Sequence, residues 1–527
     1  MKIYKFIGFI ALLGWSAVSC NDWLDVRPDT EQKEEDQFST YKGFRDALTG
    51  CYMALANEDV YGCRLTMSCT EALAGLWHMP DEPSSTSDRY QDYHLMLHEY
   101  DNDGARQAVQ AIYSKLYNII VQANLVIKHA EDNAAAFPDE ATRSVILGEA
   151  YAIRAYCQLD VLRLFGEVPG GQGTKVSLPY SEVTAFDERA TRYDFTGYSE
   201  KLIADLDKAE KLLKDNDPIF GYTFEELNAP SSVEIEDTYM CYRQSRLNYW
   251  AVKALQSRMY LYLGKADPKY LAMAYDAAKA VIDAKDRDGN PVMTLSGSSD
   301  RETNGYKACP NECLFYLSKY NVKDVASILI GGADVQTGVN YLYITPERLT
   351  RLFEGVPTDS DNRYAFMWNK NAKSSTSKKN VTILKYYFAD DVENKALYYQ
   401  IIPGDLTCHR RLFCKNKALY YQIIPMLRMS EMYLIAVETT PSLSEANALY
   451  KDYMLECGVA LDKDVFDGLN DRSGELMAEY RREFFAEGQL FYTYKRNQVK
   501  DILWLETQEM TEDDYILWNC VNTEFNP

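Results

Sequence analysis

Residues 148–169 read GEAYAIRAYCQLDVLRLFGEVP and are more informative about the fold than any other part of the chain. Around them, from Ile146 to Phe165, apolar residues recur with the 3.6-residue period of an α-helix, and alanines occupy several of the apolar positions. Small residues of this kind let a second helix approach closely. We therefore expect a long helix over 146–165 that packs tightly against its neighbours.

The same period extends in both directions from this helix. It recurs at 112–130, 198–213, 247–263, 271–284, 426–438, 444–457 and 475–487. The pair 247–264 and 266–285 carries alanines on both partners, which predicts an antiparallel hairpin. This is the composition of tetratricopeptide helix pairs, although the pairs do not recur at 34 residues. An ordinary α-bundle would account for the helices equally well, but not for the placement of Ala and Tyr.

Long irregular insertions separate the predicted helices. Gly, Pro, Ser and Asp are concentrated at 79–92, 168–192, 215–237, 286–312 and 331–380. Functional side chains on a rigid scaffold tend to lie in such loops. We therefore expect any ligand-binding aromatic residues to come from these insertions.

Composition excludes several classes of protein. The 527 residues are 46% apolar and 25% charged, as in ordinary globular proteins, which argues against disorder and against a polytopic membrane fold. With 56 basic and 78 acidic side chains the net charge is −22, so no nucleic acid is expected as a partner. The chain also contains 41 Tyr, whose rings combine an apolar face with a polar tip.

The first twenty residues are typical of an export signal. Lys2 and Lys5 precede an apolar run over 6–18 that is too short to span a bilayer, which indicates a signal peptide at 1–19. The small residues before Cys20 resemble a lipobox, in which the new N-terminal Cys carries palmitate and other lipid; ordinary cleavage is the alternative. We expect Cys20 to anchor the chain to a membrane, with 20–40 as an N-terminal arm.

No chemical motif in the chain is complete. Cys309 and Cys313 could form half of a zinc site, and His94 and His98 share the spacing of a zincin helix, but neither set has the remaining ligands or the catalytic Glu. Structural or disulfide roles remain open for the cysteines. Two calcium-like loops, at 286–290 and 359–363, lack Gly at position six and Glu at position twelve. We expect no cofactor, no metal and no catalytic residue.

Several motifs in order along the chain carry a family resemblance. They lie at 23–28, 44–52, 112–127, 148–156, 162–169, 427–438 and 481–489. Taken together they closely resemble the RagB/SusD family of surface nutrient-binding lipoproteins. One position departs from the pattern, because Gln489-Leu490-Phe491 follows Glu487-Gly488 where relatives often have an aromatic residue.

The resemblance implies a mostly α fold in which tetratricopeptide-like helix pairs, an α-α superhelix, lie under a loop-rich ligand-binding lobe. It implies one SusD-like domain over 41–527, with an N-terminal part to about 225 and a C-terminal RagB/SusD part from about 240. It further implies no catalysis but capture of a glycan, usually an oligosaccharide, for polysaccharide utilization. The chain would be lipid-anchored in the outer membrane through Cys20, would face outward, and would act with a SusC-like TonB-dependent transporter.

Two groups of loop residues are candidates for glycan binding. Sugars are held by aromatic faces against the pyranose ring and by polar side chains that bond the hydroxyls. The first group is Trp77, Arg89, Tyr90 and Tyr93, and the second is Tyr341, Tyr343, Arg363, Tyr364 and Trp368. For each of these a structural role is the alternative. We expect Arg154 and Arg428 in the signature helices to be structural.

The sequence also allows two rival functions and contains one irregularity. Glu483 and Glu487 could share a helix face as the acid and base of a surface glycoside hydrolase. A tetratricopeptide groove that holds a peptide would make the chain a protein-interaction scaffold. In addition, residues 394–403 recur identically at 416–425, and only the second copy continues into the family-like helix.

Overall fold

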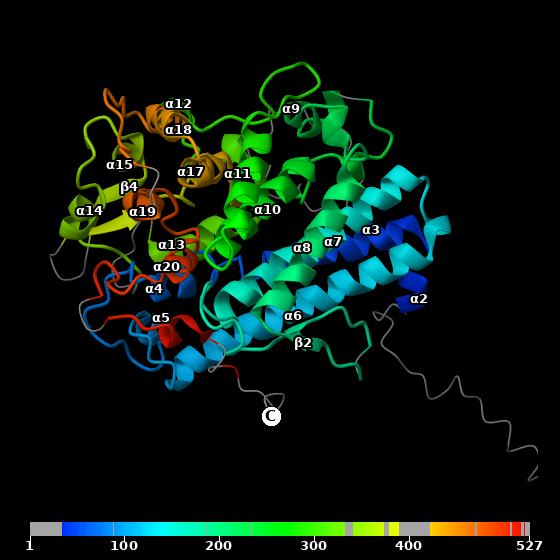
Figure 1. The fold of residues 1–527 in the computed structure, drawn as a ribbon, viewed down its shortest axis with the longest axis horizontal. Coiled ribbons are helices and arrows are strands. Elements are labelled where there is room, and N and C mark those ends of the chain that lie inside the picture. The colour runs from blue at the N-terminus through cyan, green and yellow to red at the C-terminus, as the bar shows by residue number, and fades with distance from the viewer. Residues whose placement is uncertain are drawn as a thin grey trace, which may run out of the picture.

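The computed structural model describes residues 34–331, 341–373, 379–388, 422–468, 472–505, 509–517 and 521, except 88, 186 and 233. Helices dominate these residues, which confirms the mostly α fold (Figure 1). The signal peptide, Cys20 and the first copy of the duplicated segment lie outside the described residues.

The regular elements alternate between long helices and short segments. In the N-terminal half they are α2 (Glu34–Gln37), α3 (Tyr41–Leu55), α4 (Cys69–Leu73), α5 (Tyr90–Met96), α6 (Asp103–Asp132), η2 (Ala134–Ala136), α7 (Glu140–Phe165), β1 (Leu178–Tyr180), β2 (Thr191–Tyr193), α8 (Phe195–Leu213), η3 (Pro218–Phe220), α9 (Phe224–Leu227), η4 (Pro230–Ser232), η5 (Thr238–Met240), η6 (Arg243–Ser245), α10 (Tyr249–Leu263) and α11 (Lys269–Ile282).

The C-terminal half has shorter elements. They are α12 (Ser298–Glu302), η7 (Pro310–Glu312), β3 (Cys313–Ser318), α13 (Val322–Ile330), α14 (Pro346–Leu352), α15 (Asn362–Phe366), β4 (Trp368–Lys373), β5 (Lys379–Ile383), β6 (Ile423–Arg428), α17 (Met429–Thr439), α18 (Leu443–Glu456), α19 (Ser473–Glu483), α20 (Leu490–Asn497) and η8 (Asp513–Tyr515).

The long helices begin at side chains that cap them. Asn102, Asp139, Asp194 and Asn248 precede α6, α7, α8 and α10, and each side chain accepts a hydrogen bond from a backbone N–H two or three residues on. Such caps satisfy backbone donors that the first helical turn leaves without partners. The helix predicted over 146–165 is therefore longer than its apolar pattern, because Asp139 starts it one and a half turns earlier.

Helix α7 forms the centre of the helical region and packs against both α6 and α8 (Figure 1). All but one of its residues from Ser144 to Phe165 are buried. A Cβ at Gly148 would lie 2.7 Å from Cγ of Leu213, so glycine permits the close approach of α8. Arg154 donates from Nε and Nη2 to Asp205 of α8 at 2.7 and 2.6 Å, which agrees with the structural role expected for it.

The hairpin predicted from the alanine pattern is formed by α10 and α11. Ala251 and Ala254 on the first helix and Ala274 and Ala278 on the second are all buried. The Ser257 hydroxyl donates to the carbonyl of Ala274 at 2.9 Å, which confirms that the two helices are in close contact.

A short sheet carries the chain into the C-terminal helices and corrects one predicted boundary. Strand β6 pairs antiparallel with β3, from Ile423 opposite Ser318 to Arg428 opposite Cys313. The helix predicted over 426–438 therefore begins only at Met429, because residues 426–428 complete the strand. The helix predicted over 475–487 ends at Glu483, after which the chain turns through Ala486 and Gly488 with positive φ.

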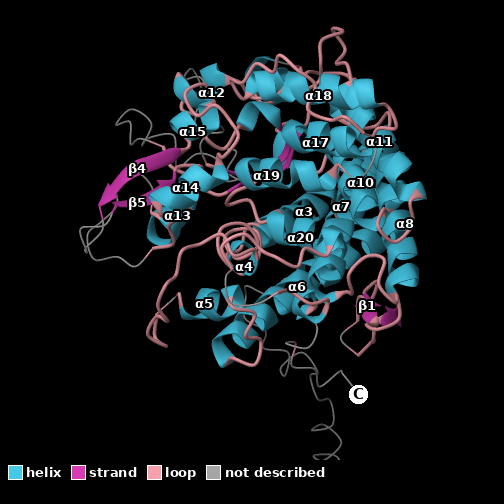
Figure 2. Ribbon diagram, turned by 60° about the vertical axis from the view of Figure 1, so that its left-hand side comes forward, coloured by secondary structure: helices cyan, strands magenta, loops and turns pink. Residues whose placement is uncertain are grey.

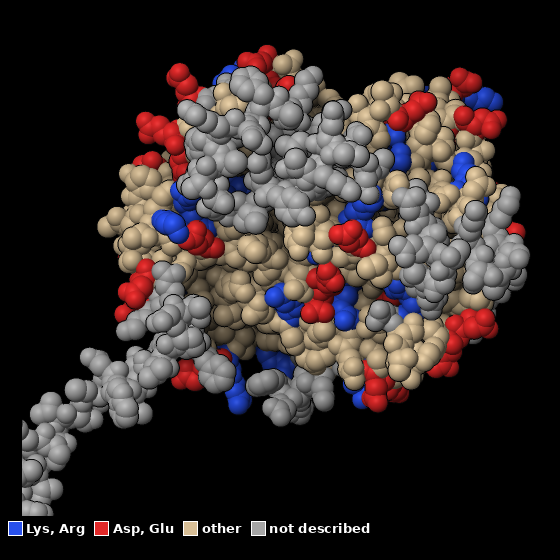
Figure 3. Space-filling model, turned by 180° about the vertical axis from the view of Figure 1, so that it is seen from behind, with Lys and Arg blue, Asp and Glu red and all other residues tan. Residues whose placement is uncertain are grey.

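The short elements gather on one side of the molecule. Figure 2 shows α4, α5, α13, α14 and the β4–β5 hairpin together, away from the long helices α8, α10 and α11. This is the loop-rich lobe that was expected. On the face seen in Figure 3, acidic and basic side chains are interspersed among uncharged residues.

The cysteines of the described residues are all free thiols. Cys51, Cys69, Cys157, Cys241, Cys309, Cys313 and Cys457 are buried and Cys63 is partly buried. Cys309 and Cys313 form no disulfide, and the Cys313 thiol donates to the carbonyl of Cys309 at 3.3 Å. Among the described helices, none is both long and apolar enough to cross a bilayer.

Candidate ligand-binding surface

A contact between His78 and Tyr343 joins two loops that are far apart in the sequence. The backbone N–H of His78 donates to the carbonyl of Tyr343 at 2.8 Å, and the two rings meet edge to face with centroids 5.6 Å apart. Tyr341 adds a third ring, 6.0 Å from that of Tyr343. The loop after α4 and the segment before α14 thus contribute to one aromatic group.

Helix α5 contributes two further tyrosines. Tyr90 and Tyr93 are half-buried, and their rings lie 4.4 and 5.4 Å from the ring of His94. The imidazole of His94 lies between two carboxylates, with Nδ1 2.6 Å from Glu99 and Nε2 3.4 Å from Glu82. We call His78, Tyr90, Tyr93, Tyr341 and Tyr343 the tyrosine surface.

The carboxylate of Asp81 contributes to a raised pKa in both parts of the tyrosine surface. Burial and the carboxylates of Glu82, Glu99 and Asp81 raise the pKa of Tyr93. Burial, Tyr341 and the same Asp81 raise the pKa of Tyr343. Asp81 is therefore within electrostatic range of both tyrosines, one from each group of residues predicted from the sequence.

The two tryptophans of the predicted groups lie beneath this surface. Trp77 is 0% exposed, and its indole N–H donates to the carbonyl of Met67 at 3.0 Å. Trp368 is 5% exposed. Both rings stand edge-on to the ring of Phe485, at 5.1 and 5.0 Å. Rings buried in this way have no free face for a sugar, so packing explains both tryptophans.

The predicted arginines are also held inside the protein. Arg89 donates from Nη2 to the carbonyl of Ile328 in α13 at 3.2 Å and lies 3.7 Å from Asp92. Arg363 is 3% exposed and is bonded to Asp361, Glu479 and Glu483. Tyr364 is half-buried, and the ammonium of Lys370 lies 3.6 Å from the centre of its ring.

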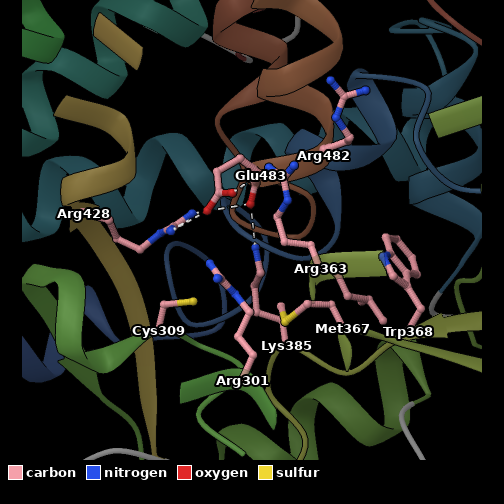
Figure 4. A pocket seen from close by; sticks show the side chains of 10 residues that line it. Arg301, Cys309, Arg363, Met367, Trp368, Lys385, Arg428, Arg482 and Glu483 are labelled. Atoms are coloured by element: carbon pink, nitrogen blue, oxygen red, sulfur yellow. Dashed lines mark hydrogen bonds and ion pairs between the residues drawn. The ribbon is translucent and has the colours of Figure 1, made fainter. Parts of the chain in front are cut away.

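A network of buried charges lies behind Arg363 (Figure 4). Arg428 donates to Glu483 at 2.7 Å, to Glu487 at 2.9 and 2.8 Å, and also to Glu312. Lys385 bonds Glu487 and the backbone carbonyl of Glu483. The cavity among these residues measures about 10 Å³, which is space for one water molecule.

The contacts in this network argue against a catalytic role for the two residues of the predicted hydrolase alternative. Glu483 and Glu487 are 4% and 5% exposed, and both carboxylates are bonded to cations. Despite desolvation, the Arg428, Arg363, Arg301 and Lys385 charges hold the pKa of Glu483 well below its usual range. Carboxylates buried against these cations cannot reach a substrate, and the lowered pKa of Glu483 makes it a poor general acid. The structural role expected for Arg428 agrees with these contacts.

The side chains of the predicted metal-like motifs contact other groups of the protein. His98 is buried, with Nε2 3.1 Å from the carbonyl of Leu73, while His94 contacts Glu82 and Glu99. Asp286 accepts the backbone N–H groups of Asp288 and Asn290, and Asp361 is bonded to Arg363. In the part of the chain that the structure describes, no three His, Cys, Asp or Glu residues are grouped to hold a metal ion.

Two exposed residues beside the lobe were not predicted. Tyr320 is 78% exposed two residues before α13 begins, and Ile328 is 62% exposed near the end of the helix. Asp324 and Ile328 are both exposed and share one face of α13 at a spacing of four residues. Tyr320 lies between two of the insertions used to select candidates. The sequence feature that could have identified Tyr320 is an aromatic residue among polar ones directly after a strand.

Comparison with known proteins finds similarity to SusD-like proteins over part of the chain. Residues 22–223 match a SusD-like family described as starch-binding and associating with the outer membrane. SusD-like protein P2 of Formosa agariphila is 30% identical over 216 residues, which are 41% of this chain and 39% of the relative. SusD-like protein P25 of the same organism is 25% identical over 169 residues. The chain thus matches about two fifths of the length of P2 and less of P25.

Solved structures share the fold over almost the whole chain. A SusD superfamily protein from Bacteroides thetaiotaomicron has a TM-score of 0.63 at 18% identity, covering 91% of this chain and 93% of that one. Surface glycan-binding protein A from the same organism, in complex with laminarihexaose, has a TM-score of 0.60 at 14% identity, covering 90% and 95%. The predicted resemblance and fold class are both confirmed.

Proposed function

We propose that this chain captures oligosaccharides at the outer face of an outer membrane, because residues 22–223 match a SusD-like family described as starch-binding and the fold is similar to that of SusD superfamily structures. The observation that carries the proposal is the tyrosine surface. Its rings come from the loop after α4, from α5 and from the segment before α14, and all of them except the buried Tyr341 are partly open to solvent.

The chemistry of these side chains suits a sugar. Partly exposed tyrosine rings offer apolar faces to the C–H groups of a pyranose, while their hydroxyls can donate and accept hydrogen bonds. The carboxylates of Asp81, Glu82 and Glu99 are exposed acceptors for sugar hydroxyls at the same place. Exposed Ile328 on α13 and Tyr320 just before it would extend the contact for a longer chain.

The proposed site combines residues from both predicted groups. Tyr90, Tyr93 and Tyr343 remain candidates for direct contact, with Tyr364 at the edge of the lobe. Tyr341 is 8% exposed and would act by packing against Tyr343. Arg89 would act by fixing α13 against α5 through its bond to the Ile328 carbonyl. We assign Trp77, Trp368 and Arg363 to the support of the surface, because their burial leaves them no contact with a ligand.

The transporter partner and the lipid anchor are part of the same proposal. The matched family is described as associating with the outer membrane. Cys20 would carry the lipid, and a SusC-like TonB-dependent transporter would receive the captured glycan. Labelling cells with a palmitate analogue tests the anchor: label and membrane retention should both be lost in Cys20→Ala. Co-purification of a large outer-membrane β-barrel with the wild-type chain tests the partner.

Titration of the purified full chain with neutral oligosaccharides, laminarihexaose among them, tests capture directly. Saturable binding without release of reducing ends is expected. Blank titrations over a wide glycan panel, together with firm binding of the transporter, would favour the scaffold alternative.

A further inference from the structure

The charges around the tyrosine surface point to the class of glycan it takes, an inference that rests on the function proposed above. We propose that the surface selects neutral over anionic glycans, and that Asp81 and Glu82 impose the selection. Both carboxylates are exposed in the loop between α4 and α5, at the edge of the rings that would contact the sugar.

Contacts with His94 hold Glu82, and a third acid, Glu99, beside the rings of the tyrosine surface. Glu82 and Glu99 approach opposite nitrogens of His94, at 3.4 and 2.6 Å, and the His94 ring is in contact with those of Tyr90 and Tyr93. The side chains of Glu82 and Glu99 are 55% and 54% exposed, so their negative charge faces the solvent above α5.

Asp81 precedes Glu82 in the same loop, is exposed, and adds a further negative charge beside it. A carboxylate or sulfate group on a sugar seated against the tyrosine surface would therefore approach a fixed charge of the same sign. In water, two unit charges 4 Å apart change affinity about fivefold, which corresponds to about 1 kcal/mol.

Three arginines of the described residues beside this surface are engaged by protein groups. Arg89 is bonded to the Ile328 carbonyl and faces Asp92, and Arg64 bonds Asp59 and Gln91. Arg348 donates to the carbonyl of Trp77 at 2.9 Å and lies over the ring of Trp504. Each of these guanidinium groups is turned toward the protein, whereas recognition of an anionic sugar uses arginines whose donors reach the ligand.

The charge of the whole chain acts in the same direction at longer range. A net charge of −22 repels a polyanionic chain during its approach, and this repulsion decreases as salt rises. A neutral glycan feels neither the local nor the long-range charge. The selection should therefore be strongest at low ionic strength.

The experiment compares two hexasaccharides of the same linkage, one neutral and one built of uronic acids, by calorimetric titration of the full chain at about pH 7.5. At about 10 mM salt, where screening extends over roughly 30 Å, the neutral sugar should bind at least about tenfold more tightly. At about 1 M salt the ratio of the two affinities should fall several-fold, because the charges are screened.

A charge-removing variant assigns the effect to the two residues. Asp81→Asn/Glu82→Gln should narrow the difference in affinity between the two sugars about fivefold or more, by tightening the binding of the anionic sugar. The control Asp132→Asn/Glu200→Gln removes the same charge from exposed positions on α6 and α8, and should leave the difference nearly unchanged.

Two results contradict the inference in different ways. Equal or tighter binding of the anionic sugar, or a difference that the Asp81/Glu82 variant does not alter, overturns the charge selection and leaves glycan capture standing. If neither hexasaccharide binds, and no glycan of a wider neutral panel binds, the proposal of glycan capture is wrong and the charge selection is wrong with it.

Discussion

The ring of Trp77 stands edge-on to the ring of Phe485, with centroids 5.1 Å apart and planes at 82°. This contact joins the loop after α4 to the turn after α19, two segments at opposite ends of the chain. It shows that a tryptophan next to an irregular insertion can be part of the core.

Replacing Trp77 with Ala should therefore lower stability. Loss of a fully buried aromatic side chain costs about 3–5 kcal/mol, and the Met67 carbonyl would also lose its indole donor. Chemical denaturation of the variant should show this loss. A variant with unchanged stability and weakened glycan binding would contradict the buried position of Trp77.

Replacing Tyr343 or Tyr93 with Ala should weaken glycan binding and leave stability nearly unchanged. These rings are partly exposed, so we expect glycan affinity to fall about fivefold, about 1 kcal/mol, with little change in melting temperature. Tyr270→Ala is the matched control, because that half-buried ring lies on α11 and stacks on Tyr260. Binding that is insensitive to both lobe variants would place the site elsewhere.

Replacing Arg428 with Ala should destabilise the C-terminal half. The guanidinium serves Glu312, Glu483 and Glu487, and its removal leaves buried carboxylates without their cation, at a cost of about 3–5 kcal/mol. Arg428→Lys should recover only part of this loss, because one ammonium cannot match the paired contacts to Glu487. Denaturant melts of both variants make the comparison; full recovery by Lys would show that charge alone suffices.

Replacing Gly488 with Ala should be severely destabilising. Gly488 has φ +72°, and a Cβ there would lie 1.8 Å from the carbonyl oxygen of Leu65. Both the left-handed backbone and the collision oppose any larger residue. Gly474→Ala in α19 is the control, since a Cβ there meets nothing within 4 Å and Ala favours the helix by about 0.5–1 kcal/mol. Comparable melting temperatures for the two variants would contradict this account.

Stability should also fall as pH drops from about 6.5 toward 4. Burial lowers the pKa of His98 to about 4, so the unfolded chain takes up a proton in this range and the folded protein does not. The His98 contribution, about 3 kcal/mol, is complete above pH 6.5 and lost progressively below it. Denaturant titrations across this range should show the slope in the wild type and a smaller slope in His98→Gln.

The helices were predictable from sequence because their signals are local. The periodic apolar pattern gave α7, α8, α10 and α11, whose ends depend on nearby caps and turns. The segment 426–428 was predicted as helix because apolar residues continue into α17. Only pairing with β3, a contact more than a hundred residues distant, makes it a strand.

The site was only partly predictable, because burial is decided by tertiary contacts. Tyr93 and Tyr343 carried the same signal as Trp77 and Trp368, namely an aromatic residue in or beside an insertion. Neither composition nor spacing could show that Phe485 would cover the two tryptophans. Asp81 was not predicted because acidic residues in a polar loop, here Asp81 next to Glu82, have no distinguishing pattern.

The two copies of the duplicated segment continue into different sequences. Residues 401–403 and 423–425 are both Ile-Ile-Pro, and the second copy lies in β6. Met426, Leu427 and Arg428 follow the second copy, whereas Gly404, Asp405 and Leu406 follow the first. Arg428, at the end of β6, contacts the buried acids Glu312, Glu483 and Glu487.

The arrangement of the lobe has a consequence for how such proteins diversify. The side chains that hold it together, from Phe485 to the Arg428 network, lie beneath the surface, and the tyrosines and acids that would meet a ligand lie on short loops above. Exchange of residues 78–82 and 341–343 would leave every carboxylate of the Arg428 network in place. One scaffold could thus be adapted to chemically different nutrients through a few surface substitutions, without a new fold for each.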